Sequence, residues 1–329
     1  MKNKRTGLGV VLLISAVIAV VAPMPAASQA AYPARLVRLV VSSSPGGGTD
    51  TTARIISPKL GELLGQQIVV ENRPGASSQI GGEHVARSAP DGYTLLMTAS
   101  SLVVVQSTYR KPRINPLREL APITQVVVVP QLLASHPSIP VSNLKELIAF
   151  VRARPGKLDY SAGNYGGHPH VTMALFMTMA RLDATFVPYK SGNAGLSDAL
   201  SGHVPLMLGN VLAALPHVRT GRLRAYGVTS ARRAAAVPDI PTIAEAGLPG
   251  YQSEQWFGVL APAGTPAPVL NRLHRDLLKV IQDDQIKQRF LADGGDATWS
   301  NTPEEFAAFI RAEDAKWAKV VRDARIKPQ

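Results

Sequence analysis

A triple glycine between a predicted strand and a predicted helix is the stretch of this sequence best suited to bind a ligand. Residues 36–41 form an apolar run typical of a buried strand, and residues 51–60 carry apolar side chains at helical spacing. Glycines let a ligand approach the backbone closely, and a helix N-terminus presents free amides and the positive end of its dipole. We therefore expect a small anion, a carboxylate or a phosphate, to bind the residues between them: Ser43, Ser44, Gly46, Gly47, Gly48, Thr49 and Asp50.

This glycine run does not match the common nucleotide-binding loops. The dinucleotide pattern G-x-G-x-x-G needs a glycine where Thr51 stands, and a P-loop needs a lysine after its last glycine, where Thr49 stands. Asp50 would repel a phosphate chain, and Thr49 or Asp50 can instead cap the helix. A smaller anion fits better, although a tight turn that binds nothing would also explain the glycines.

A second glycine-rich turn precedes a helix predicted from about Val171. Its candidate ligand-binding residues are Tyr165, Gly166, Gly167 and His168. Two such loops facing each other across a cleft would hold both ends of a dianion, or a carboxylate and a polar group. His168 and His170 could bind a metal, but they lack a nearby acidic or thiol partner. We therefore expect no metal, and a capping or donor role for His170. Tyr165 either packs on the ligand or simply packs at the strand end.

The N-terminal segment has the organisation of a secretory signal peptide. Lys2, Lys4 and Arg5 precede an apolar stretch over residues 8–22, and Ser28-Gln29-Ala30 fits a small-x-small cleavage site. Cleavage would remove residues 1–30, the alternative being a retained anchor. The sequence contains no cysteine, which excludes disulfides, thiol chemistry and a lipidated cysteine. We expect an exported, periplasmic protein.

The chain is basic, with a net charge of +12 that falls to +9 when the three basic residues of the signal segment are subtracted (12 − 3). The basic residues are scattered, aromatic residues are few, and no nucleic-acid-binding motif is present. We expect no nucleic-acid partner. A basic surface of this kind mildly favours anionic ligands.

Strands and helices alternate through the mature chain, which is long enough for two domains. The pattern predicts parallel sheets with helices on both faces, an α/β architecture. Expected strands beyond the first are residues 68–71, 94–97, 185–188, 204–208 and 223–229; expected helices are residues 82–88, 143–154, 171–181, 268–281 and 303–323.

Two extended segments, residues 121–134 and 251–266, are interpreted as crossings between the domains. The chain would then leave domain 1, build domain 2, and return. Domain 1 would comprise residues 31–128 and 252–329, and domain 2 residues 129–251. Two crossings of this kind act as a hinge that lets domains close over a ligand.

Many segments of the mature chain resemble the Bug/TctC family, the periplasmic solute-binding receptors of tripartite tricarboxylate transporters. No single segment is specific, but together they are. They include Pro45-Gly46-Gly47-Gly48-Thr49-Asp50, Glu71-Asn72-Arg73-Pro74-Gly75-Ala76, Ala89-Pro90-Asp91-Gly92-Tyr93-Thr94, Val187-Pro188-Tyr189-Lys190, Pro241-Thr242-Ile243-Ala244-Glu245-Ala246-Gly247 and Trp256-Phe257-Gly258-Val259.

The resemblance implies a type II periplasmic-binding-protein fold with two α/β domains, a ligand cleft between them and two crossing strands. It also implies a small carboxylate held mainly by backbone amides and waters of the two loops, with Asn210 nearby, and delivery to membrane transporter subunits. We expect a monomer without a cofactor. One departure concerns Gly209, where the family commonly has an aspartate suited to an ammonium group. Its absence argues against an amino-acid ligand.

The sequence leaves two other classes of function as alternatives. An exported α/β enzyme acting on a small anion is poorly supported, because the chain has no G-x-S-x-G nucleophile elbow, no H-E-x-x-H motif and no cysteine. A ligand-sensing adaptor for a membrane sensor is compatible with a receptor. Turnover of candidate carboxylates would identify the enzyme, and capture of a membrane partner by the liganded form would identify the adaptor.

Overall fold

The first sheet is covered by helices on both faces, and its strands are accordingly apolar on both sides. The computed structural model describes residues 32–189 and 192–329, so the predicted signal segment lies outside the described residues. In β1, four of the five residues are buried. The strands of this sheet are β1 (Val37–Val41), β2 (Ile68–Asn72), β3 (Thr94–Ala99), β4 (Leu120–Val129), β10 (Gln255–Pro262) and β11 (Asp296–Ala297), in the order β11-β4-β10-β3-β1-β2.

The sheet is mixed, so the expectation of parallel sheets holds for some of its strands and is wrong for others. β1 runs parallel to β2 and β3, as strand–helix alternation predicts. β10, however, lies antiparallel between β3 and β4, and β11 lies antiparallel to β4. The antiparallel neighbours come from distant parts of the chain, and no local pattern encodes that pairing.

Alternate residues of the strands face two separate helix layers. Leu39 of β1 and Val259 of β10 belong to the cluster that includes α1 and the C-terminal helices α10 and α11. Val40 and Leu260, one residue further along each strand, pack instead with α2, α3 and α12. The helices of this part are α1 (Gly48–Leu64), α2 (Gln79–Ala86), α3 (Ser101–Thr108), α4 (Pro116–Glu119), α10 (Ala267–Gln282), α11 (Asp284–Ala292) and α12 (Pro303–Asp323).

A second, five-stranded sheet is built from the middle of the chain. Its order is β7-β6-β8-β5-β9, with β5 antiparallel to both of its neighbours and β6 parallel to β7 and β8. Its elements are β5 (Gln131–Ser135), α5 (Leu144–Arg152), β6 (Asp159–Ser161), α6 (His168–Ala180), β7 (Thr185–Val187), α7 (Gly192–Ser201), β8 (Leu206–Asn210), α8 (Val211–Arg219), β9 (Arg224–Val228) and α9 (Ile243–Ala246).

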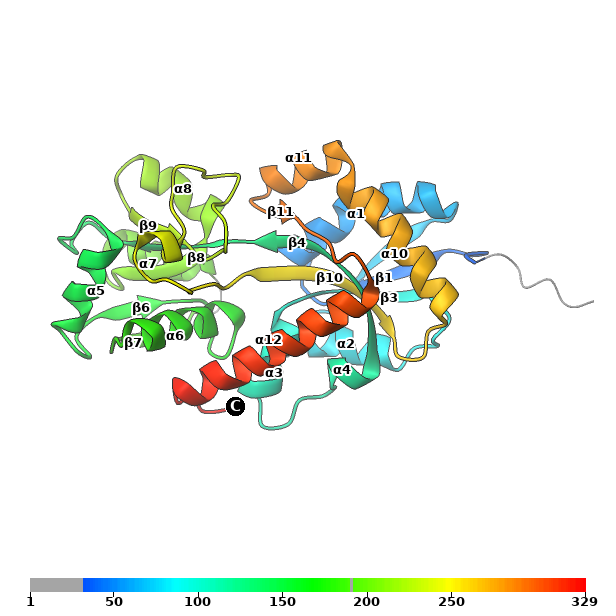
Figure 1. Ribbon diagram of the computed structural model, residues 1–329, viewed down its shortest axis with the longest axis horizontal. Helices are drawn as coiled ribbons and strands as arrows, with labels where there is room; N and C mark the ends of the chain where they lie inside the picture. Colours follow the sequence, from blue (N-terminus) through cyan, green and yellow to red (C-terminus); the bar gives the residue numbers. More distant parts are fainter. Residues whose placement is uncertain (1–31, 190–191) are drawn as a thin grey trace, which may run out of the picture. The chain divides into compact units, whose positions relative to one another are not determined.

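The two predicted crossings are confirmed. β4 of the first sheet runs through Pro130 directly into β5 of the second, and the chain returns through Ser253 into β10 (Figure 1). Proline suits the junction because it has no N–H to contribute to either strand ladder. A further connection comes from α12, which starts over the first sheet and contacts both α3 and α6. Trp317 of α12 is fully buried there beside Val104 and Val171.

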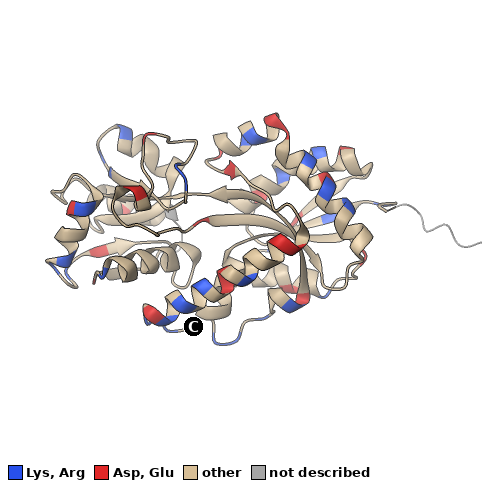
Figure 2. Ribbon diagram, viewed as in Figure 1, with Lys and Arg blue, Asp and Glu red and all other residues tan. Residues whose placement is uncertain are grey.

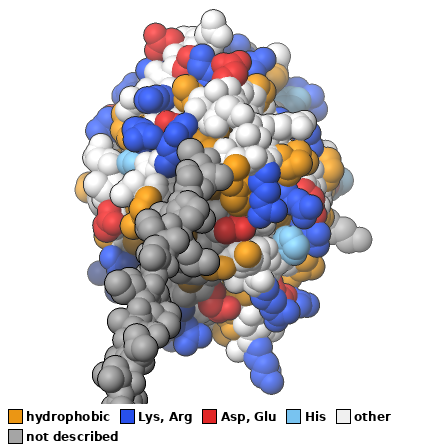
Figure 3. Space-filling view, turned by 90° about the vertical axis from the view of Figure 1, so that its right-hand side faces the viewer, with side chains coloured by type: hydrophobic (Ala, Val, Ile, Leu, Met, Phe, Trp, Pro, Cys, Tyr) orange, Lys and Arg blue, Asp and Glu red, His pale blue; other side chains and the backbone are white. Residues whose placement is uncertain are grey.

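Charged side chains are scattered over the described elements rather than gathered in blocks. Basic and acidic residues follow one another along α12 (Figure 2). On the face shown in Figure 3, lysines and arginines are interspersed with acidic and apolar side chains. Within residues 32–189 and 192–329, no helix has the length and apolar character needed to span a membrane.

Candidate ligand-binding site

The loop after β1 is shaped by its glycines and by a buried carboxylate. Gly46 adopts a left-handed conformation (φ +76°), and Gly47 is extended and forms the N-cap of α1. The Asp50 carboxylate reaches back to accept hydrogen bonds from the Gly46 amide (2.9 Å) and the Asn72 side chain (2.9 Å). It also pairs with Arg54 at 3.0 Å. Asp50 therefore holds the loop in place, a role that the sequence did not reveal.

The environment of Asp50 keeps it ionised. Burial by itself raises the pKa of this carboxyl group, but the hydrogen bonds from Arg54, Gly46 and Asn72 outweigh burial and hold the pKa below its usual value. The charges of Asp50 and Arg54 offset each other. The anion-binding capacity of this helix end therefore rests on its amides.

Three amides at the start of α1 remain available for a ligand. The amide of Gly46 donates to Asp50, and that of Gly47 donates to the Ser44 carbonyl at 3.1 Å. No side chain caps the helix, and the amides of Gly48, Thr49 and Asp50 have no partner among the described residues. Three converging amides at the positive end of a 17-residue helix make a site for one carboxylate group.

A pocket of about 270 Å³ lies beside this helix end, and we call it the glycine-loop pocket. One wall comes from the loop and the first turn of α1, and Asn210 forms another. The structure thus brings together Gly46, Gly48 and Asn210, which are far apart in the sequence. The remaining lining residues are Thr51, Thr52, Val127, Val129, Gln255, Phe257, Phe290, Asp293 and Gly295.

Asn210 has a structural task as well as a place in the pocket. It is the last residue of β8 and the N-cap of α8, where its side-chain oxygen accepts a hydrogen bond from the Ala213 amide at 3.2 Å. With the oxygen occupied, the side-chain NH₂ is the group left to donate to a ligand. Asn210 therefore caps α8 with its side-chain oxygen and offers its NH₂ group as a hydrogen-bond donor in the glycine-loop pocket.

Several lining residues were not among the predicted site residues. Phe257 lies on β10, and a Cβ added at Gly48 would stand only 3.1 Å from its ring. The sequence indicated its Trp-Phe-Gly segment as a family feature within a predicted crossing, not as part of the binding site. Phe290 lies on α11, and Asp293 and Gly295 come from the corner between α11 and β11; the sequence showed no binding signal for any of the three.

The other predicted residues do not line the glycine-loop pocket. Ser43 and Ser44 lie in the same loop, where the Ser44 carbonyl accepts the Gly47 amide, and the Thr49 side chain is buried in the first turn of α1.

The second loop makes its own contacts elsewhere. Its Gly166 carbonyl accepts a hydrogen bond from Thr108, and the Gly167 amide donates to Asn164. The Tyr165 hydroxyl bonds the backbone of Lys327 in both directions, donating at 3.0 Å and accepting at 3.1 Å.

Both histidines of the second loop are buried and neutral. The His168 ring packs edge-on against Trp317, with Thr172 at 3.4 Å from its Nδ1. Burial, helped by the positive charge of Lys316, lowers the pKa of His168 to about 3 against a small opposing effect of the Glu254 backbone.

Burial also lowers the pKa of His170, to about 4. The Nδ1 atom of His170 accepts the Gly166 amide at 3.1 Å, which requires that this nitrogen be unprotonated. Among the described residues, no group of three or more histidine and acidic side chains is placed to hold a metal ion.

The low histidine pKa values predict a loss of stability in acid. The unfolded chain binds protons at these histidines below about pH 6.5, whereas the folded protein does not until about pH 4 to 3. Stability is therefore complete above pH 6.5 and falls with pH across this window. In urea unfolding between pH 7 and pH 4, we expect the wild type to lose about 3 kcal/mol more than a His168→Gln variant. Equal losses would show that His168 is protonated in the folded protein.

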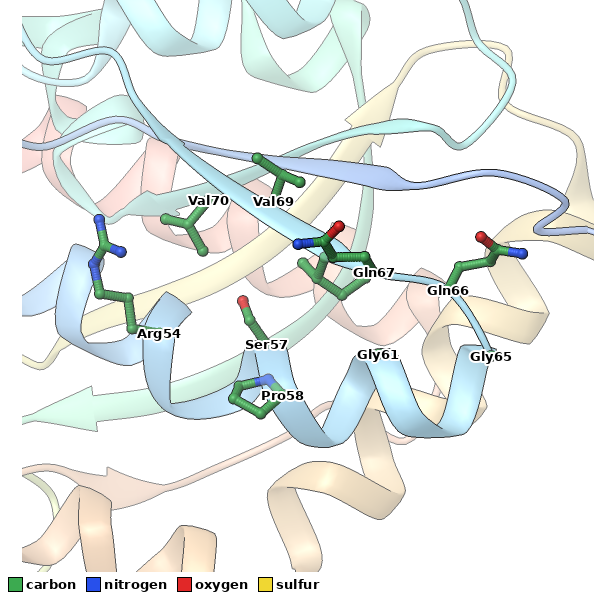
Figure 4. A pocket seen from close by; sticks show the side chains of 10 residues that line it. Arg54, Ser57, Pro58, Gly61, Gly65, Gln66, Gln67, Val69 and Val70 are labelled. Atoms are coloured by element: carbon green, nitrogen blue, oxygen red, sulfur yellow. The ribbon is translucent and has the colours of Figure 1, made fainter.

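A larger hollow of about 760 Å³ lies between α1 and the segment that runs into β2, and it is not the candidate site. It is lined by α1 from Arg54 onwards and by residues 65–70, up to β2 (Figure 4). This is the part of α1 that leads to its C-terminal end at Gly65, where the helix dipole is negative. An anion is better placed at the opposite end of the helix, in the glycine-loop pocket.

Comparison with protein families gives a direct match over most of the chain. Residues 52–326 match the tripartite tricarboxylate transporter family receptor, TctC. The chain belongs to this family. Its members are solute-binding receptors, and the recognition made from the sequence motifs is confirmed.

Individual TctC relatives are similar over nearly their whole length. Protein BugT of Bordetella pertussis is 35% identical over 327 residues, which cover 99% of each chain. Among solved structures, Rpa4515 of R. palustris with adipate is 34% identical, with a TM-score of 0.78 over 91% of this chain and 100% of that one. MatC from Rhodopseudomonas palustris with bound malate is 29% identical, with a TM-score of 0.73 over 88% and 100%. The periplasmic-binding-protein fold is thereby confirmed.

Proposed function

We propose that this protein is a periplasmic receptor that captures a small carboxylate and delivers it, as a monomer, to the membrane subunits of a tripartite tricarboxylate-type transporter. Membership of the TctC family supports the receptor role. The adipate and malate in the structures of two relatives support the class of ligand. The domain boundaries at residues 128–129 and 251–252 form part of this proposal.

The observation that carries the proposal is the free N-terminus of α1 at the glycine-loop pocket. The amides of Gly48, Thr49 and Asp50 have no partner among the described residues, and Gly48 lines the glycine-loop pocket. A carboxylate accepts such hydrogen bonds strongly, because bonds to an ionised acceptor are stronger than neutral ones. Asn210 adds a donor from the second sheet, so a bound ligand would touch residues of both sheets.

We also propose that the second loop contacts the ligand. Gly166, Gly167, His168 and Tyr165 would contact the distal end of a ligand if that loop approached the first one. In support, α6 starts at His168 with no side-chain cap. Tyr165 already contacts the C-terminal segment through Lys327, which favours the packing role for this side chain.

The lining of the glycine-loop pocket supports a binding role. It contains the hydroxyl groups of Thr51 and Thr52 and the carboxyl group of Asp293, but no histidine, lysine or cysteine that would act as a base beside a nucleophile. This composition supports reversible capture of a ligand.

The test compares acids with neutral analogues of the same shape. Protein purified from the periplasm is first examined by native mass spectrometry for a bound small acid. Calorimetry then compares each candidate carboxylate with its primary amide. We expect the acid to bind at least a hundredfold more tightly, because loss of the charge removes the interactions with the helix end. Equal affinities, or turnover of the acid during the titration, would contradict the proposal.

A further inference from the structure

The lining of the glycine-loop pocket includes two features of opposite charge. The first is the N-terminus of α1, with its free amides at Gly48, Thr49 and Asp50. The second is the corner that follows α11, where Asp293 lines the pocket. Asp293 is the C-cap of α11, so its carboxylate adds to the negative end of that helix dipole.

Asp293 is the one ionisable residue in this lining. It is exposed, and no basic side chain among the described residues forms an ion pair with it. Its negative charge is therefore not neutralised by the protein. A cationic group of a ligand would supply the missing partner.

The charge of the pocket lining favours one kind of carboxylate ligand over another. A dicarboxylate would bring two negative charges to a lining with one formal negative charge and no formal positive one. Its second carboxylate would gain donors from Asn210 and Gln255 but would be repelled by Asp293. A carboxylate that also carries an ammonium group would place opposite charges at both ends.

We propose that the glycine-loop pocket selects a compact, amine-bearing carboxylate, with the carboxylate at the N-terminus of α1 and the ammonium at Asp293. The inference rests on the proposed receptor function and deepens it. In relatives that have an aspartate at the position of Gly209, that residue is suited to bind an ammonium group. Here Asp293 would bind it instead, from a different element of the fold. The valines of β4 and the rings of Phe257 and Phe290 would pack on the short hydrocarbon chain between the two charged groups.

The experiment uses two sets of probes matched in chain length. One set is γ-aminobutyrate, succinate and butyrate, and the other is ε-aminocaproate, adipate and caproate. Calorimetry on the full mature protein, stripped of bound ligand, compares the wild type with Asp293→Asn. The matched control is Asp284→Asn, which removes an exposed carboxylate from the first turn of the same helix, outside the pocket. Thermal melting checks that all three proteins are folded.

We expect the wild type and the control to bind at least one amino acid tenfold or more tightly than the diacid of the same length. Asp293→Asn should lose that preference, by a factor of about ten, which corresponds to about 1.4 kcal/mol. If the wild type prefers the diacids, or if Asp293→Asn changes amino acids and diacids equally, the role of Asp293 is overturned while the receptor function stands. If no carboxylate in either set binds, both the role of Asp293 and the proposed receptor function are overturned.

Discussion

A Gly48→Pro variant is expected to bind the carboxylate ligand at least tenfold more weakly than the wild type. Gly48 is the first residue of α1, a position where proline is well tolerated, and the preceding Gly47 is already extended as a residue before proline should be. The substitution therefore removes one free amide and leaves the helix in place. A hydrogen bond to a charged group contributes about 1.5–3 kcal/mol, which corresponds to a tenfold or larger effect on affinity.

Gly48→Ala is the matched control for this change. Both substitutions place a Cβ about 3.1 Å from the Phe257 ring, but alanine keeps the amide. Calorimetry of the two variants with the same acid separates the loss of the donor from the crowding of the ring. Equal affinities for the two variants would mean that the Gly48 amide does not touch the ligand.

Gly294→Ala is expected to destabilise the protein by about 2–5 kcal/mol. Gly294 follows α11 in a left-handed conformation (φ +75°), and an added Cβ would lie 2.6 Å from the side chain of Leu212 on α8. The left-handed backbone costs about 1–2 kcal/mol for a residue other than glycine, and overpacking adds about 1–3 kcal/mol. Because this contact joins α8 to the corner that carries Asp293, we also expect weaker ligand binding.

Gly221→Ala isolates the backbone part of that effect. Gly221 has nearly the same backbone angle (φ +72°), but no atom lies within 4 Å of the position of an added Cβ. Urea unfolding should show a loss of only about 1–2 kcal/mol for this control. If both variants lose the same amount, the approach of Leu212 to Gly294 does not contribute to stability.

Local features of the fold were predictable, and long-range ones were not. The strand ending at Val41, the glycines after it and the helix that follows are encoded within about 25 consecutive residues, and the structure confirms them. The expectation for the first sheet failed at β10, because its insertion between β3 and β4 joins segments more than 120 residues apart. Strand direction is a property of pairing, which a single segment does not specify.

The same distinction holds within the candidate site. The free amides of α1 follow from the glycine run and the helix start, and the sequence indicated them. The inward orientation of Asp50 depends on Asn72 of the neighbouring strand β2, a contact that spacing alone does not show. Nothing in the sequence distinguishes Asp293 from other acidic residues, and it lines the pocket only because the fold brings the corner after α11 there.

The position of β10 also sets the order in which this chain can fold during its synthesis. All five strands of the second sheet lie between Gln131 and Val228, so that sheet can assemble from a continuous length of chain. The first sheet cannot close until residue 262 has been made, because β10 must enter between β3 and β4. Until then β3 and β4 each have an edge that lacks its partner strand, and unpaired strand edges make a partly folded chain prone to aggregate.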